Sequence, residues 1–167
     1  MRKIVTLLFL VSAVLSNAQA FKGKGDIKAQ VGASFQKGAN GIQVASDFGI
    51  GENMSYGFVG SYILGGFGEV AGIAIEVPFK DRVDIKARFN ANIGKVLTLP
   101  DNIDVYPGLD LGLKNFGAHL GVRYFFSDGF GLYSELGVPI ASYEKLPSGV
   151  TGYNDQFIFN VGVSFNL

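Results

Sequence analysis

His119 is the only histidine in this chain of 167 residues. A histidine could activate a serine nucleophile if a carboxylate oriented its ring, as in base-activated triads. No serine lies two residues from His119 on an extended strand, and the candidate partners elsewhere are Ser142 and Asp110. One histidine and no cysteine also give no metal-ligand spacing. We therefore expect His119 to be structural, with no catalytic, cofactor or metal site in the chain.

A second candidate motif lies at Gly66 to Ala71, which matches the G-x-G-x-x-A pattern of dinucleotide-binding loops. That pattern needs a helix behind it, whose N-terminus holds the pyrophosphate. The residues that follow are rich in β-branched types and contain Pro78, so no such helix is expected. We interpret the match as accidental.

Charged residues form the third candidate group, because they recur at alternate positions of several extended stretches, opposite apolar residues. Both signs are present, and unpaired charges in a narrow interior are costly, so we expect ion pairs and hydrogen bonds that plug it. The alternative is a narrow, charge-lined conduit. The predicted interior charges are Lys28, Asp47, Asp84, Lys86, Arg88, Asp110, Arg123 and Glu135, with Asp26 and Asp104 beside them.

Eight stretches of alternating apolar and polar residues must position these charges. This pattern is typical of β-strands. Residues 65–80 are expected to form a long loop with strand extensions, since Ile73 and Ile75 keep the parity of the next strand. The even count predicts an all-β fold, an antiparallel up-and-down barrel. The expected strands are 26–35, 42–50, 56–64, 81–93, 105–113, 118–126, 130–140 and 156–167.

The composition of the two strand faces indicates which one points outward. The apolar face carries no charge, as lipid demands, and charged residues are only 17% of the chain. Most of the strand glycines lie on the opposite face, and the narrow interior of an eight-stranded barrel needs small side chains. A soluble lipocalin-like barrel or sandwich is the alternative. A lipocalin would be expected to carry a tryptophan near its first strand, and this chain has none. We expect the apolar face to contact lipid.

The first 20 residues have the features of a signal peptide. Arg2 and Lys3 precede an apolar run from Ile4 to Leu15, and Ala18-Gln19-Ala20 forms an A-x-A cleavage site. The run is shorter than the ~17 to 25 apolar residues of a spanning helix, which argues against a membrane anchor. We predict cleavage after Ala20, a barrel domain over 21–167, and membrane insertion by strands.

The last stretch, QFIFNVGVSFNL, ends with Phe165 near the C-terminus. Together with RYFFSDGFGLYSELG (123–137) and the signal peptide, it resembles the small outer-membrane barrels of the OmpA/OmpX type, and in particular short outer-membrane barrel families of Bacteroidota. The resemblance implies a Gram-negative outer membrane, with Phe165 as part of the assembly signal. It also implies lipid and lipopolysaccharide as surroundings, and barrel-assembly machinery and periplasmic chaperones as partners in biogenesis.

With the C-terminus in the periplasm, the external connections would be 36–41, 65–80, 114–116 and 142–153. We expect a monomeric structural or surface-interaction barrel whose external loops meet a partner, and no nucleic-acid binding because the net charge is 0. The alternatives are a narrow small-solute channel and a lipid-modifying enzyme, since outer-membrane acyl hydrolases and transferases place a histidine at a similar position.

Overall fold

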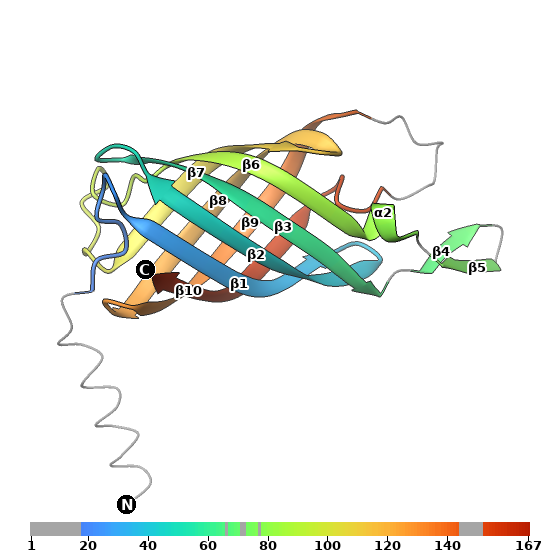
Figure 1. Ribbon diagram of the computed structural model, residues 1–167, viewed down its shortest axis with the longest axis horizontal. Helices are drawn as coiled ribbons and strands as arrows, with labels where there is room; N and C mark the ends of the chain where they lie inside the picture. The colour runs from blue at the N-terminus through green and yellow to red at the C-terminus, as the bar shows by residue number, and fades with distance from the viewer. Residues whose placement is uncertain (1–17, 66, 71–72, 77, 144–151) are drawn as a thin grey trace, which may run out of the picture.

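The computed structural model describes residues 18–65, 67–70, 73–76, 78–143 and 152–167. Within them, eight antiparallel strands form a closed barrel in the order β1-β10-β9-β8-β7-β6-β3-β2 (Figure 1). The predicted all-β barrel is therefore confirmed. The barrel strands are β1 Ile27–Gln36, β2 Ala39–Gly49, β3 Met54–Gly65, β6 Val83–Ala91, β7 Ile103–Gly112, β8 Asn115–Ser127, β9 Phe130–Ser142 and β10 Ile158–Asn166.

The connection between β3 and β6 differs from the prediction. β4 (Phe67–Val70) and β5 (Ile73–Glu76) pair with each other in a separate two-stranded sheet, which lies beyond the end of the barrel in Figure 1. A four-residue helix, α2 (Phe79–Arg82), follows Pro78 and separates this hairpin from β6. The expected extension of the fourth strand from residue 73, and its start at residue 81, are therefore wrong. Proline has no N–H to donate to a β-ladder, so pairing with the barrel begins only after it.

Two other turns are tighter than predicted. β1 and β2 are separated by residues 37–38 rather than 36–41, and β7 and β8 by residues 113–114 rather than 114–116. Backbone pairing reaches Gln36 and Ala39 in the first hairpin, and Leu111 and Phe116 in the second. At the last strand, β10 begins at Ile158 instead of residue 156. Most of the predicted signal peptide (1–17) and residues 144–151 of the last loop lie outside the described residues.

The barrel has two distinct ends. We call the end with the connections 37–38, 66–82, 113–114 and 143–157 the loop end; the opposite end, next to the C-terminus, is the terminal end (Figure 1). Ala18, Ala20 and Phe21 are buried at the terminal end, where the Ala20 N–H donates to the Asp101 carbonyl at 2.7 Å. No helix in the described part of the chain is long and apolar enough to cross a membrane.

The strand faces are sorted as expected. Large apolar side chains point outward and remain accessible, for example Val44 (50% exposed) and Phe58 (54%). The alternate positions point inward and bury polar and charged groups. Ile158, which breaks the alternation of the last strand, is buried on the inner side. The barrel is thus apolar outside and polar inside, the reverse of a typical soluble protein.

Three large aromatic side chains also fill the interior, where small ones were expected. Tyr106, Phe125 and Tyr133 are each no more than 2% exposed. Glycines on other strands make room for them, because a Cβ at these positions would overlap the aromatic side chain. Tyr106 lies over Gly121, Phe125 over Gly131, and the Tyr133 hydroxyl reaches Gly32. These three glycines therefore match large neighbours on the inner face.

Adding a methyl group at Gly121 is expected to destabilise the barrel. Gly121 lies opposite Tyr106 in the β7–β8 ladder, and its added Cβ would collide with the Tyr106 ring. Overpacking of this kind costs about 1–3 kcal/mol. Chemical denaturation of Gly121→Ala should show this loss in the free energy of unfolding. Gly129→Ala is the matched control, since no atom lies within 4 Å of a Cβ there. Equal effects of the two substitutions would contradict this account.

Candidate functional site

The centre of the barrel is occupied by a network of ion pairs around Arg88 and Asp47. Arg88 Nε lies 2.6 Å from Asp47 Oδ1 and Arg88 Nη2 lies 2.8 Å from Asp47 Oδ2, a bidentate pair between β6 and β2. Arg88 Nη1 donates to Glu135 Oε2 of β9 at 2.9 Å, and Nη2 also donates to Gln30 Oε1 of β1 at 2.8 Å. The guanidinium thereby connects four strands across the lumen.

Arg123 extends this network toward the terminal end. Its guanidinium pairs with Asp47 Oδ2, so one carboxylate is shared by two arginines. The Arg123 Cζ atom also lies 3.9 Å from the centre of the Tyr106 ring, within the range of a cation–π contact. Asp47, Arg88 and Arg123 are each at most 3% exposed. The predicted interior charges of the central layer are therefore brought into direct contact.

Two further ion pairs join predicted charges outside this network. Lys28 pairs with Asp26 near the terminal end, and its Nζ lies 5.5 Å from the centre of the buried Phe125 ring. Lys86 Nζ lies 3.7 Å from Asp84 Oδ2 near the loop end. All eight predicted interior charges point inward, although Lys86 keeps some exposure.

His119 is buried and has neighbours at both ring nitrogens. Nε2 lies 2.8 Å from Asn90 Oδ1 and Nδ1 lies 3.0 Å from Asp110 Oδ1. Asp110 is thus brought to the ring as one of the two predicted partners. Ser142 is not, because it is exposed and lies opposite Asn115 at the end of the β8–β9 ladder. Both ring nitrogens thus face an amide or a carboxylate oxygen rather than a serine hydroxyl.

The Asn90 side chain continues from His119 into a chain of hydrogen bonds. Asn90 Nδ2 donates to Ser55 Oγ at 3.1 Å, and Ser55 Oγ donates to Asn92 Oδ1 at 3.0 Å. Asn92 Nδ2 then donates to Asp104 Oδ2 at 2.8 Å, beside the terminal end. These hydrogen bonds run along the lumen from His119 Nε2 to Asp104, as expected for buried polar groups. At the other side of the ring, His119 Nδ1 and Asp110 Oδ1 lie close together without a hydrogen bond between them.

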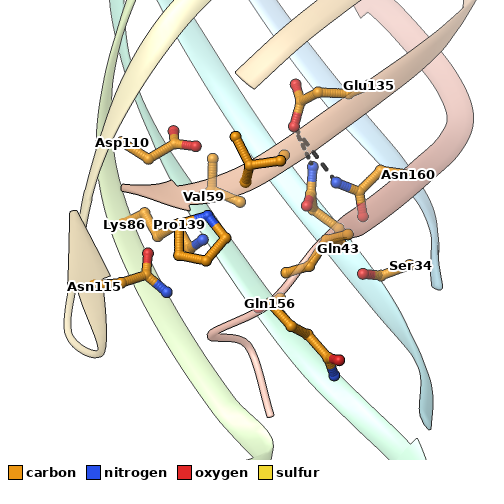
Figure 2. A pocket seen from close by; sticks show the side chains of 14 residues that line it. Ser34, Gln43, Val59, Lys86, Asp110, Asn115, Glu135, Pro139, Gln156 and Asn160 are labelled. Carbon is orange, nitrogen blue, oxygen red and sulfur yellow. Dashed lines mark hydrogen bonds between the residues drawn. The ribbon is translucent and has the colours of Figure 1, made fainter. Parts of the chain in front are cut away.

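A recess lies between the central network and the loop end. It is small and partly open to solvent. Figure 2 shows Asp110, Lys86 and Asn115 on one side of it and Glu135, Gln43 and Asn160 on the other. Gln43 and Asn160 each point an amide nitrogen toward Glu135 Oε1 at 3.5 Å. The recess therefore ends at the ion-pair network.

The residues that lead into β10 cover part of the mouth of the recess. Asn154 is 1% exposed and has a left-handed backbone (φ 61°), which asparagine tolerates better than most residues. Its N–H donates to Gln36 Oε1 at 2.8 Å, and its carbonyl accepts from Asn115 Nδ2 at 2.8 Å. Asn154 thus bridges β1 and β8 across the opening.

Several of these interior residues were not predicted as site residues. Gln30, Tyr106 and Asn90 lie on the inner face, as their parity indicates, but parity does not reveal which of them meet across the lumen. Asn115 was expected in the connection 114–116 and instead begins β8. The other predicted positions lie at the terminal end. Ala20 is fully buried there, and Phe165 on the outer surface has its ring 5.7 Å from that of Phe130. No group of three or more potential metal ligands occurs among the described residues.

Solved structures of designed proteins resemble this barrel. One comes from the de novo design of transmembrane beta-barrels; it has a TM-score of 0.54 and 9% sequence identity, covering 87% of this chain and 98% of its own. Another, the solution NMR structure of the de novo designed TMB2.3, has a TM-score of 0.51 and 12% identity, covering 87% and 97%. At these identities the likeness shows the fold alone.

No curated protein sequence matches the chain. A family model does, over residues 11–167, and its description is a family of unknown function. Because the match covers nearly the whole chain, the protein belongs to this family, DUF6646.

Proposed function

We propose that the protein is a small monomeric outer-membrane barrel of a Gram-negative bacterium, with a structural or surface-interaction role and a closed lumen. The observation that carries this proposal is the apolar outer surface. On the eight barrel strands, the outward positions of the described residues hold no charged residue, while the interior holds ten predicted charges and His119. A surface of this kind is unfavourable in water and suited to lipid. The designed transmembrane barrels of the same fold are consistent with this location.

Aromatic side chains near the ends of the strands support the same orientation. At the terminal end, Phe126 lies between Tyr124 and Phe130, with ring centres 4.9 and 6.2 Å away. Near the loop end, Phe35 stacks on Phe159 with 6.2 Å between ring centres. Aromatic girdles at the two interfaces are a regular feature of membrane barrels. The loop end would then face outward, and lipid with lipopolysaccharide would surround the strands.

The lumen favours a structural role over a channel or an enzyme. Arg88, Asp47 and Glu135 connect opposite walls, so a solute would have to break buried ion pairs to pass. The His119 ring faces Asn90 and Asp110 rather than a hydroxyl group. We infer that loops at the loop end, rather than the lumen, would meet an envelope or surface partner, and that chaperones and assembly machinery act during biogenesis.

Electrophoresis and conductance test this proposal on the purified protein. The folded protein is expected to resist SDS and to change its mobility on boiling, since membrane barrels stay closed in detergent. In a planar lipid bilayer it should give no steady conductance, because the central network fills the lumen. A soluble periplasmic protein without the mobility change would overturn the membrane location. A steady conductance would overturn the closed lumen and favour a channel.

A further inference from the structure

The recess at the loop end has oxygen acceptors that lack donors. Asn115 donates both amide hydrogens, to the Asn154 carbonyl and to Asp155 Oδ1, each at 2.8 Å. Its Oδ1 atom is therefore fixed as an acceptor, and it has no hydrogen-bond partner within the described part of the chain. Figure 2 shows this oxygen directed toward Lys86. Asn160 Oδ1, on the opposite wall, is likewise buried without a donor from the described residues. A buried acceptor without a donor is costly, so these atoms favour an occupant rich in N–H or O–H groups.

The charges around the recess favour a cation. Asp110 and Glu135 both line it. Glu135 is already paired with Arg88 at 2.9 Å, whereas Asp110 faces the imidazole of His119. Lys86 also lines the recess, but its nearest carboxylate is Asp84, at 3.7 Å. The negative charge of Asp110 is therefore compensated less directly than that of Glu135, and an N–H donor carrying a positive charge would complement it.

Part of the lining is apolar. Val59 and Ile158 are 5% and 7% exposed, and both line the recess together with Pro139. Figure 2 places Val59 and Pro139 between the two polar walls. This surface would contact carbon atoms and gives no partner to a hydrated inorganic ion. The recess thus pairs an acceptor wall with an apolar wall.

We propose that the recess binds a short primary alkylammonium ion. Its ammonium group lies against Asp110 and Asn115, and its alkyl group lies against Val59 and Pro139. The segment around Asn154 covers part of the site and so reduces its contact with bulk water, which strengthens charge-assisted hydrogen bonds. This inference concerns the lumen and does not depend on the membrane location or on the absence of conductance.

Lys86 allows the proposal to predict whether a substitution strengthens or weakens binding. Its side chain is itself a primary ammonium on an alkyl stem, directed into the same recess. It therefore competes with the ligand for the acceptors and repels its charge. Removing the Lys86 charge should strengthen binding, and removing the Asp110 charge should weaken it.

The test is an NMR titration of the purified, folded protein with ethylammonium chloride. Saturable shifts of the Asn115 side-chain amide signals are expected. Asp110→Asn should weaken binding roughly tenfold, the usual size of one lost charge-assisted hydrogen bond. Lys86→Met, which keeps most of the stem, should tighten it several-fold. Lys95→Met is the matched control, because Lys95 is exposed at the terminal end, and it should leave binding unchanged.

Two ligand controls need no variant that could fail to fold. Tetraethylammonium has the same charge but no N–H donor, and sodium chloride reproduces the ionic strength. Neither should give saturable shifts at Asn115. Equal shifts with tetraethylammonium, or no saturation with ethylammonium, would overturn the proposal and leave water as the occupant. Tighter binding in Asp110→Asn would overturn the assigned position of the ammonium group.

Discussion

Asp47→Asn is expected to lower the free energy of unfolding by about 3–5 kcal/mol, the range found when one partner of a buried ion pair is removed. Asp47 is the shared anion of Arg88 and Arg123, and the replacement keeps its shape while removing its charge. Two buried guanidinium groups would then face an amide that cannot balance them. Chemical denaturation, followed by circular dichroism or by the mobility change in SDS, measures the loss.

A double-mutant cycle separates this ion pair from general damage to the interior. Arg88→Met should itself be destabilising, because it leaves Asp47 and Glu135 with less positive charge nearby. The double variant Asp47→Asn/Arg88→Met should lose less stability than the sum of the two, since the charges are removed together. Asp101→Asn at an exposed position is the matched control and should cost little. Additive losses in the cycle would show that the pair contributes no coupling energy.

Alternation was sufficient to predict the barrel because each strand has one apolar and one polar face. Parity alone places Asp47, Arg88 and Glu135 inside and Val44 outside, and the structure has them there. Antiparallel pairing of consecutive strands then follows from short connections. The same rule failed at Ile73 and Ile75. A period of two is shared by every strand, so it could not distinguish an extension of β6 from a separate hairpin.

For the contacts within the lumen, the sequence predicts the type of interaction but not the partners. The need to pair buried charges predicts ion pairs, but the partners of Arg88 come from β1, β2 and β9, which are distant in sequence. Their meeting depends on strand stagger and tilt, which side-chain parity does not encode. Tyr106 illustrates the same limit. Its ring fits inside because Gly121 is its ladder partner, a pairing that requires the register.

A single lysine substitution on the outer surface can test whether that surface faces lipid. Val44 lies in the middle of β2, half exposed, with Val31 and Gly60 as its ladder neighbours. In phospholipid vesicles, Val44→Lys is expected to lower the free energy of unfolding by about 2–4 kcal/mol, the cost of a lysine near the bilayer midplane. On a water-facing strand the same change would fall within about 0.5 kcal/mol, as surface substitutions usually do.

The position of the lysine along β2 provides the control for Val44→Lys. Asn40 is exposed on the same strand but lies at the loop end, where a lysine would reach the interface or water. Asn40→Lys should therefore cost no more than about 1 kcal/mol, the value near the interfaces of membrane barrels. A large loss at position 44 with a small one at 40 would follow the depth profile of a bilayer. Equal small losses at both would mean that β2 faces water, and the apolar outer surface would then need a protein partner to cover it.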